Sequence, residues 1–286
     1  MSSQHNSLRW RSGVNLVVIA AALVAITVIT NTYSFNLMLR NFRQSLSSTA
    51  QIYTEQIRGK VDKINSGSLE LVSLAASSQN YYTSSPLGRY LTQQDILTRL
   101  QDRIRYVESS DLYFFYRTDS DELLTALSNR PSTGSSYFWN QYLMLPPTQP
   151  ANTWFSVTCN GETWLMCYYN VSQVRVGAAV RAKTLLQSLY ADTGLVQDSG
   201  FALAGLDGTI VYSSQPDLMA CGTSLAGHIP ASLIVESHTV PEVGTLLLFR
   251  PSSDLLHQLS GSFGWLLLLN LLALALITTM LLNTNR

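Results

Sequence analysis

Two long uncharged apolar runs lie near the ends of this 286-residue chain, and most polar residues lie between them. The first run covers residues 14–33 and the second covers residues 261–282, and neither contains Asp, Glu, Lys or Arg. Because about 20 apolar residues in a helix cross a hydrocarbon core roughly 30 Å thick, each run predicts a transmembrane helix. The chain then divides into a tail (1–13), two membrane-spanning segments, a central segment (34–260) and an end segment (283–286).

The charges beside the first run predict its orientation. Arg9 and Arg11 precede it, and the tail contains no acidic residue. The positive-inside rule therefore places the tail and Arg286 in the cytoplasm and the central segment outside, although Arg40 and Arg43 argue weakly against this. The alternative, a cleavable signal peptide, has a shorter apolar stretch and a small-residue cleavage site, which does not follow here. A two-pass membrane protein is expected.

The central segment begins with a helical pattern from about residue 34 to 77. Apolar residues recur there at spacings of three, four and seven, as on one face of a helix: Leu39, Phe42, Leu46, Tyr53, Ile57, Ile64 and Leu71. This stripe packs either on its own domain or against a partner helix in a homodimer. A second helix is expected at about 92–107.

Short β-branched and aromatic segments then predict strands in two groups. The first group comprises 111–117, 123–128, 154–158, 163–171 and 174–180, with Asn160-Gly161 as a hairpin turn and helical segments at 137–145 and 182–190. The second comprises 201–206, 209–213, 233–239 and 244–250, with Asp207-Gly208 as a turn. The predicted fold class is α+β, with antiparallel-sheet modules at 34–190 and 191–260.

Composition and motifs narrow the chemistry. The formal net charge is zero, so no basic surface points to nucleic acid. The register of the Asn160-Gly161 hairpin pairs 159 with 162 and 154 with 167, which puts Cys159 and Cys167 on opposite faces, so free thiols are expected rather than a local disulfide. We expect no metal or cofactor, because the four histidines have no ligand-like spacing. Residues 119–122 lack the glycine and closing glutamate of a calcium loop. No catalytic triad is evident, so an enzyme is not predicted.

The chain resembles the double Cache extracytoplasmic sensor regions of bacterial transmembrane receptors. The resemblance lies in residues 201–214 and 222–225, which are similar to the membrane-proximal hairpin and the loop after it. Residues 176–180 leading into 185–189 are similar to the last distal strand and the connecting helix. The resemblance implies two PAS-like modules on a long helix, a homodimer, and a small ligand bound in the distal module.

The resemblance also implies that the signal passes through the second transmembrane helix to a cytoplasmic output, as in two-component histidine kinases. No kinase motif follows Leu282, so any kinase activity is expected in a continuation of the chain or in a separate signalling partner. The amino-acid-binding members carry an Arg that residues 137–142 lack and an Asp that residues 176–181 lack. Recognition of an amino acid is therefore not expected, and a small molecule, a sugar or a peptide remains.

Strand alternation selects the candidate ligand residues. The face with Phe155, Val157, Trp164 and Met166 is uniformly apolar, so it is expected to pack on the long helix. The opposite face mixes aromatic and polar groups, as ligand pockets do. The candidates are Tyr113, Arg117, Trp139, Tyr142, Trp154 and Tyr169. Arg117 either anchors a carboxylate or phosphate, or forms a surface ion pair with Asp119 or Asp121.

Polar and small residues in the apolar runs are candidates for packing between transmembrane helices. Asn15 and Asn270 are each able to form a hydrogen bond across a helix pair, worth about 1–2 kcal/mol in model peptides. Ala21 and Ala25 allow close approach beside Asn15. Alternatively, Asn15 lies at the headgroup edge.

The sequence thus favours the ligand-sensing region of a receptor in a bacterial cell membrane. The alternatives are a membrane-anchored extracytoplasmic interaction protein that acts with a partner, or the sensor part of a chemoreceptor or of a membrane-bound transcription regulator.

Overall fold

The structure is a computed structural model, and it describes most of the chain outside the segment between the second and third strands and the C-terminal end. The described residues are 2–78, 85–107, 110–120, 122–128, 151–159, 161–191, 199–226, 229–253, 264–265, 268–269, 271–273, 275–276 and 279. Residues 46–231 and 235–250 form one compact unit that contains both sheets, and the remaining residues form a second unit.

A single long helix, α1 (Ser2–Ser78), contains both the first apolar run and the helical pattern that follows it. Within the described residues one stretch, Ala21–Ala76, is long and apolar enough to cross a membrane. Ala21 and Ala25 are exposed, whereas Asn31, which the sequence analysis did not single out, is buried. The side chain of Asn15 and all of Asn270 lie outside the described residues, so the second crossing and the packing role of these residues stay predictions.

The apolar stripe of α1 packs on its own domain along the part of the helix that carries the sheets. Leu46, Tyr53, Ile57, Ile64 and Leu71 are all buried. The helix α2 (Pro86–Tyr106) begins earlier than expected. The sequence reading missed its cap: the Ser85 hydroxyl accepts a hydrogen bond from the Gly88 amide at 3.3 Å, and Pro86 occupies the first turn.

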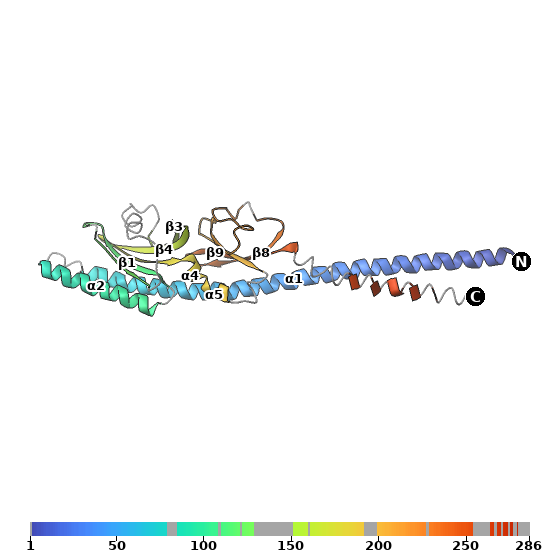
Figure 1. Cartoon of the computed structure of the whole chain (residues 1–286), viewed down its shortest axis with the longest axis horizontal. Helices are drawn as coiled ribbons and strands as arrows, with labels where there is room; N and C mark the ends of the chain where they lie inside the picture. Colours follow the sequence, from blue (N-terminus) through green and yellow to red (C-terminus); the bar gives the residue numbers. More distant parts are fainter. Residues whose placement is uncertain are drawn as a thin grey trace. The chain divides into compact units, whose positions relative to one another are not determined.

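The first sheet has five antiparallel strands in the order β2-β1-β5-β4-β3. These strands are β1 (Leu112–Arg117), β2 (Glu122–Leu127), β3 (Phe155–Cys159), β4 (Glu162–Val171) and β5 (Val174–Arg181). Cys159 pairs with Glu162, which confirms the predicted register of the Asn160-Gly161 hairpin. The helices α1 and α2 run along one face of this sheet (Figure 1).

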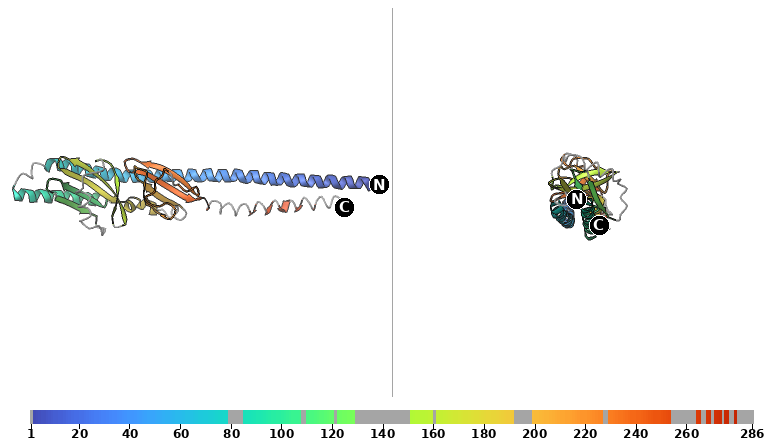
Figure 2. Two further views of the ribbon diagram at one scale, coloured as in Figure 1. Left: turned by 90° about the horizontal axis from the view of Figure 1, so that it is seen from above. Right: turned by 90° about the vertical axis from the view of Figure 1, so that its left-hand side faces the viewer.

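The second sheet is smaller and follows two short helices, α4 (Ala182–Leu185) and α5 (Gln187–Ala191). Its four strands lie in the order β7-β6-β9-β8. They are β6 (Gly200–Ala204), β7 (Ile210–Ser213), β8 (Leu233–Val240) and β9 (Gly244–Pro251). The two sheets follow one another along α1 (Figure 2). The predicted α+β class with two antiparallel sheets and a long N-terminal helix is therefore confirmed, whereas the module boundary near residue 190 stays a prediction.

Packing inside the five-stranded sheet depends on one glycine in its central strand. A Cβ at Gly177 would lie 2.2 Å from the Cys167 carbonyl oxygen and 2.8 Å from Phe114 Cζ. The Cys167 carbonyl oxygen is a backbone atom, so it is unable to move away from an added methyl group as a flexible side chain would. Gly177 therefore leaves the space that the Phe114 ring occupies at the centre of the sheet.

We predict that Gly177→Ala lowers the free energy of unfolding by at least about 2 kcal/mol, as overpacking of a core does. Gly59→Ala is the matched control, because Gly59 lies inside α1 with no atom within 4 Å of the added methyl group. That substitution should stabilise the chain by about 0.5–1 kcal/mol. Melting temperatures of the full chain in a mild detergent measure both. Equal effects of the two substitutions would contradict the close packing at Gly177.

Candidate functional site

The face of the five-stranded sheet that points away from α1 carries a cluster of large apolar and aromatic side chains. We call it the Trp164 face; it consists of Leu112, Phe114, Tyr116, Trp164, Met166, Tyr168 and Ala179. All seven are buried, and Leu123, Ala151 and Phe155 pack against them while remaining partly exposed. The Phe155 ring meets the Tyr168 ring edge-on, with 6.0 Å between centroids.

The register explains why these residues share one face. Residues that pair across antiparallel strands point to the same side. Leu112 pairs with Ala179, which pairs in turn with Met166. Gly177 pairs with both Phe114 and Tyr168. Three neighbouring strands, β1, β5 and β4, therefore contribute to one continuous surface.

The opposite face packs on α1, and Tyr113 shows this directly. Its hydroxyl donates a hydrogen bond to the Ile64 carbonyl oxygen at 3.3 Å. Gly67 makes room for the ring, since a Cβ there would lie 2.5 Å from the Tyr113 hydroxyl oxygen. Burial, the largest cause, raises the pKa of Tyr113 to about 12.

The predicted orientation of the sheet is therefore wrong. Phe155, Trp164 and Met166 were expected against the long helix, but they lie on the side away from it, and Tyr113 lies against the helix instead. The prediction assumed that a uniformly apolar face suits a helix. A tyrosine also suits one where its hydroxyl reaches a backbone carbonyl and a glycine provides space.

The other candidate ligand residues are dispersed. Tyr169 alternates with Tyr168 along β4, so it belongs to the α1 side of the sheet. Trp154 is buried just before β3, and its Nε1 has no hydrogen-bond partner among the described atoms. Trp139 and Tyr142 lie outside the described residues. A role of any of these residues in ligand binding stays a prediction.

Arg117 forms the local ion pair that was one of its two expected roles. Its Nε donates to Asp119 Oδ1 at 2.8 Å, and its Nη2 contacts Asp119 Oδ2. These hydrogen bonds hold the pKa of Asp119 below its ordinary value.

Two arginines that the sequence analysis missed lie over the aromatic rings of the Trp164 face. The Arg181 guanidinium carbon lies 5.5 Å from the Trp164 ring centroid, and that of Arg175 lies 5.9 Å from the Tyr116 centroid. Each arginine is the cross-strand partner of the ring it covers. The pairing of β5 with β1 and with β4 would have identified both arginines. That pairing depends on the register of the central strands.

Arg181 is also held by a buried carboxylate. Its Nη2 donates to Asp111 Oδ1 at 2.7 Å, and its backbone amide donates to Asp111 Oδ2 at 2.9 Å. The side chain of Asp111 is only 2 % exposed. The hydrogen bond to Asp111 raises the pKa of Arg181, and its Nε is buried without a hydrogen-bond partner in the described part of the chain.

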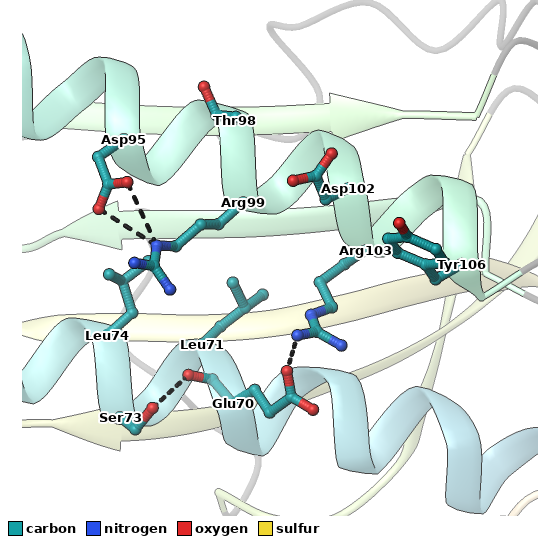
Figure 3. A pocket seen from close by; sticks show the side chains of 10 residues that line it. All are labelled: Glu70, Leu71, Ser73, Leu74, Asp95, Thr98, Arg99, Asp102, Arg103 and Tyr106. Atoms are coloured by element: carbon teal, nitrogen blue, oxygen red, sulfur yellow. Dashed lines mark hydrogen bonds and ion pairs between the residues drawn. The ribbon is translucent and has the colours of Figure 1, made fainter.

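A groove of about 450 Å³ lies between α1 and α2 (Figure 3). Its lining carries both signs of charge, and most of these charges pair locally: Arg99 with Asp95 at 3.2 Å, and Arg103 with Glu70. The Asp95 and Arg99 side chains are more than half exposed. The groove is a solvated helix surface with compensated charge.

The described residues contain no group of three or more His, Cys, Asp or Glu side chains arranged to hold a metal ion. Of the described thiols, Cys167 is buried and Cys221 is exposed, and both are free.

The fold is similar to that of known extracytoplasmic sensory domains. The periplasmic sensory domain of the Campylobacter jejuni chemoreceptor Tlp1 superimposes with a TM-score of 0.50 at 10 % identity, over 74 % of this chain and 95 % of that one. The ligand-binding domain of the Pseudomonas aeruginosa amino acid chemoreceptor PctB in complex with L-Arg gives 0.49 at 13 % identity, over 75 % and 97 %. The Vibrio cholerae LuxQ periplasmic domain gives 0.41 at 12 % identity, over 73 % and 99 %.

At these identities the likeness establishes the fold alone, and the first of the three carries it. No protein-family model matches the sequence, and no curated protein sequence matches it. The structural comparison therefore shows that the chain shares the fold of a periplasmic sensory domain.

We predict that Asp111→Asn lowers the free energy of unfolding by about 3 kcal/mol, because it leaves the largely buried Arg181 without its counter-charge. Asp119→Asn is the matched control, since it removes the carboxylate from a pair at the end of β1 and should cost under about 1 kcal/mol. Thermal melting of both variants measures the difference. If the two substitutions cost the same, Arg181 does not depend on Asp111.

The buried hydroxyl of Tyr113 predicts a loss of stability at high pH. Its pKa is about 12 in the folded chain and about 10 when unfolded, so the folded state binds more protons between these values. The contribution of Tyr113 is fully present below pH 10 and is lost as pH rises towards 12. Tyr113→Phe should reduce the fall in unfolding free energy over this range by up to about 1.4 kcal/mol per pH unit. Melting curves from pH 9 to 12 measure the slope, and equal slopes for both proteins would contradict the buried hydroxyl.

Proposed function

We propose that this chain is the extracytoplasmic ligand-sensing region of a bacterial transmembrane receptor and that the ligand binds at the Trp164 face. The observation that carries the proposal is a buried aromatic cluster on the side of the sheet away from α1, overlaid at two points by arginines. Aromatic surfaces with a few polar groups at fixed places are typical of small-molecule sites.

The charge beside Trp164 favours an uncharged ligand at that ring, because Asp111 compensates the Arg181 guanidinium. Arg117 belongs to the opposite, α1-facing side of β1, since it alternates with Tyr116. The Arg181 Nε, buried and unpartnered among the described residues, is suited to donate to a carbonyl or hydroxyl oxygen. The expected ligand therefore has an apolar or aromatic surface and neutral hydrogen-bonding groups, as a sugar or a small uncharged molecule does.

We also propose that Trp139 and Tyr142 contribute to the site. Both lie in the connection from β2 to β3, and these strands are the two edges of the sheet. The connection therefore joins opposite edges of the sheet, and its aromatic residues add to the chemistry of the Trp164 face.

The output of the receptor lies on the other side of the membrane in this proposal. Ligand binding shifts the second transmembrane segment, 261–282, within a homodimer, and the cytoplasmic response belongs to a histidine kinase region or to a separate signalling partner. A ligand produces such a shift only if it binds the two states of the receptor with different affinities.

A thermal-shift screen of the full chain in a mild detergent tests the proposal, with neutral saccharides, uncharged aromatic compounds, peptides and amino acids as probes. A ligand at 100 times its Kd adds about 2.7 kcal/mol, which raises the melting temperature of a domain of this size by about 5–10 °C. Trp164→Leu should abolish the shift. Phe115→Leu is the matched control, a buried aromatic on the α1 side of the same sheet, and should preserve it.

Two results would overturn the proposal. One is a screen in which no compound raises the melting temperature of the wild-type chain. The other is a shift that survives Trp164→Leu, which would place the ligand elsewhere.

A further inference from the structure

The tip of the β8–β9 hairpin, residues 241–243, contacts a part of the molecule that lies outside its own sheet. Glu242 Oε2 accepts a hydrogen bond from Asn65 Nδ2 on α1 at 2.9 Å. On either side of Glu242, Val240 and Val243 are buried, with 0 % and 2 % exposure. The hairpin tip is thus packed against the protein although Glu242 itself is exposed.

The backbone conformation of Glu242 at the hairpin tip costs free energy, because this residue is not a glycine. Glu242 has φ +67°, in the left-handed region that favours glycine or asparagine. Such a conformation persists where the surroundings hold it, and here the Val243 amide closes the turn on the Val240 carbonyl oxygen at 3.2 Å. A glutamate at this position indicates that its side chain, and not the turn alone, contributes to the contact.

The turn of α1 that binds the hairpin tip also binds the five-stranded sheet, because the Tyr113 hydroxyl donates to the carbonyl oxygen of Ile64, the residue before Asn65, at 3.3 Å. Burial raises the pKa of Cys167 and of Tyr169 to about 12, and the negative charge of Glu242 adds to both effects. Cys167 and Tyr169 belong to the α1 side of β4, whereas Trp164, Met166 and Tyr168 belong to its other side.

The same turns of α1 hold the segment that follows β5. Lys60 Nζ donates to the Leu185 carbonyl oxygen at 2.9 Å, five residues before Asn65. Burial lowers the pKa of Lys60. Residues 60–65 of α1 therefore bind both the end of α4 and the tip of the β8–β9 hairpin.

We propose that the hairpin tip is a latch between the two sheets and that Glu242 is the residue that positions it. The proposal rests on the proposed ligand site. The sheet that carries the Trp164 face is held through Tyr113 to Ile64 on α1, and the neighbouring Asn65 holds the latch, so a ligand that displaces this sheet against α1 moves both. The latch leads directly to β9, the last strand before the second apolar run in the sequence. Movement at the ligand site thereby reaches the segment that connects to the membrane.

Reactivity of the buried Cys167 thiol tests the latch without any ligand. The full chain, with Cys159→Ser and Cys221→Ser, is placed in nanodiscs and labelled with N-ethylmaleimide, and the rate is followed by mass spectrometry. Glu242→Ala and Asn65→Ala should each increase the labelling rate of Cys167 about three- to tenfold, which is the effect expected for loss of one hydrogen bond. The double variant should label no faster than the faster single variant, because the two side chains act as a pair.

Glu236→Ala is the matched control, because Glu236 lies on β8 of the same hairpin, away from the tip. Its labelling rate should equal that of the parent. The melting temperature of each variant shows whether labelling reports local opening and not global unfolding. An unchanged rate in Glu242→Ala, or additive effects in the double variant, would overturn the latch.

Hydrogen exchange of the β8–β9 hairpin amides tests the coupling to the ligand face. Trp164→Leu should increase exchange at residues 240–244 in the parent chain and should have no further effect in the Glu242→Ala chain. Equal increases in both backgrounds would overturn the coupling. The failure of the ligand-sensing proposal is distinguishable from the failure of the latch. If both latch tests succeed but no screened compound stabilises the chain, the latch is supported and the ligand-sensing proposal fails.

Discussion

The five-stranded sheet has only two faces, and α1 occupies one of them. This constraint decides the use of every side chain in the sheet. The hydrogen bond from Tyr113 to the Ile64 carbonyl oxygen, with Gly67 providing space for the ring, fixes which face meets the helix. Phe114 alternates with Tyr113 along β1 and is consequently directed to the other side, and the strand register puts Trp164 on the same side as Phe114.

The charges of the sheet follow from the same arrangement. Arg181 extends over Trp164 because the two residues are cross-strand partners, and the buried Asp111 compensates its charge. Ion pairs of this kind cost desolvation and are retained where they fix geometry, which we propose for the guanidinium at this site. The groove between α1 and α2 differs, because its charged side chains are largely exposed and pair within the helices and between them.

The contacts of α1 also join the two sheets. Lys60 and Asn65 bind the chain at the end of α4 and at the β8–β9 hairpin tip, so one short part of a helix contacts both modules. The proposed sensing role needs such a rigid element, because a displacement in one packed layer reaches another only through groups that are in contact.

The secondary-structure elements and their order can be read from the amino-acid sequence alone. The apolar stripe of α1, the Asn160-Gly161 register and the two groups of strands all follow from local periodicity and turn chemistry, which depend on residues close together in the chain. The start of α2 is also set locally, by the Ser85 cap, but the sequence analysis did not predict it. The face of the sheet that meets the helix became evident from the packing in three dimensions, because both faces carry aromatic residues and strand alternation alone does not distinguish them. The three-dimensional structure also established the pairs Arg181–Asp111, Tyr113–Ile64 and Asn65–Glu242, since these residues are far apart in sequence and only the register and packing of whole elements bring them together.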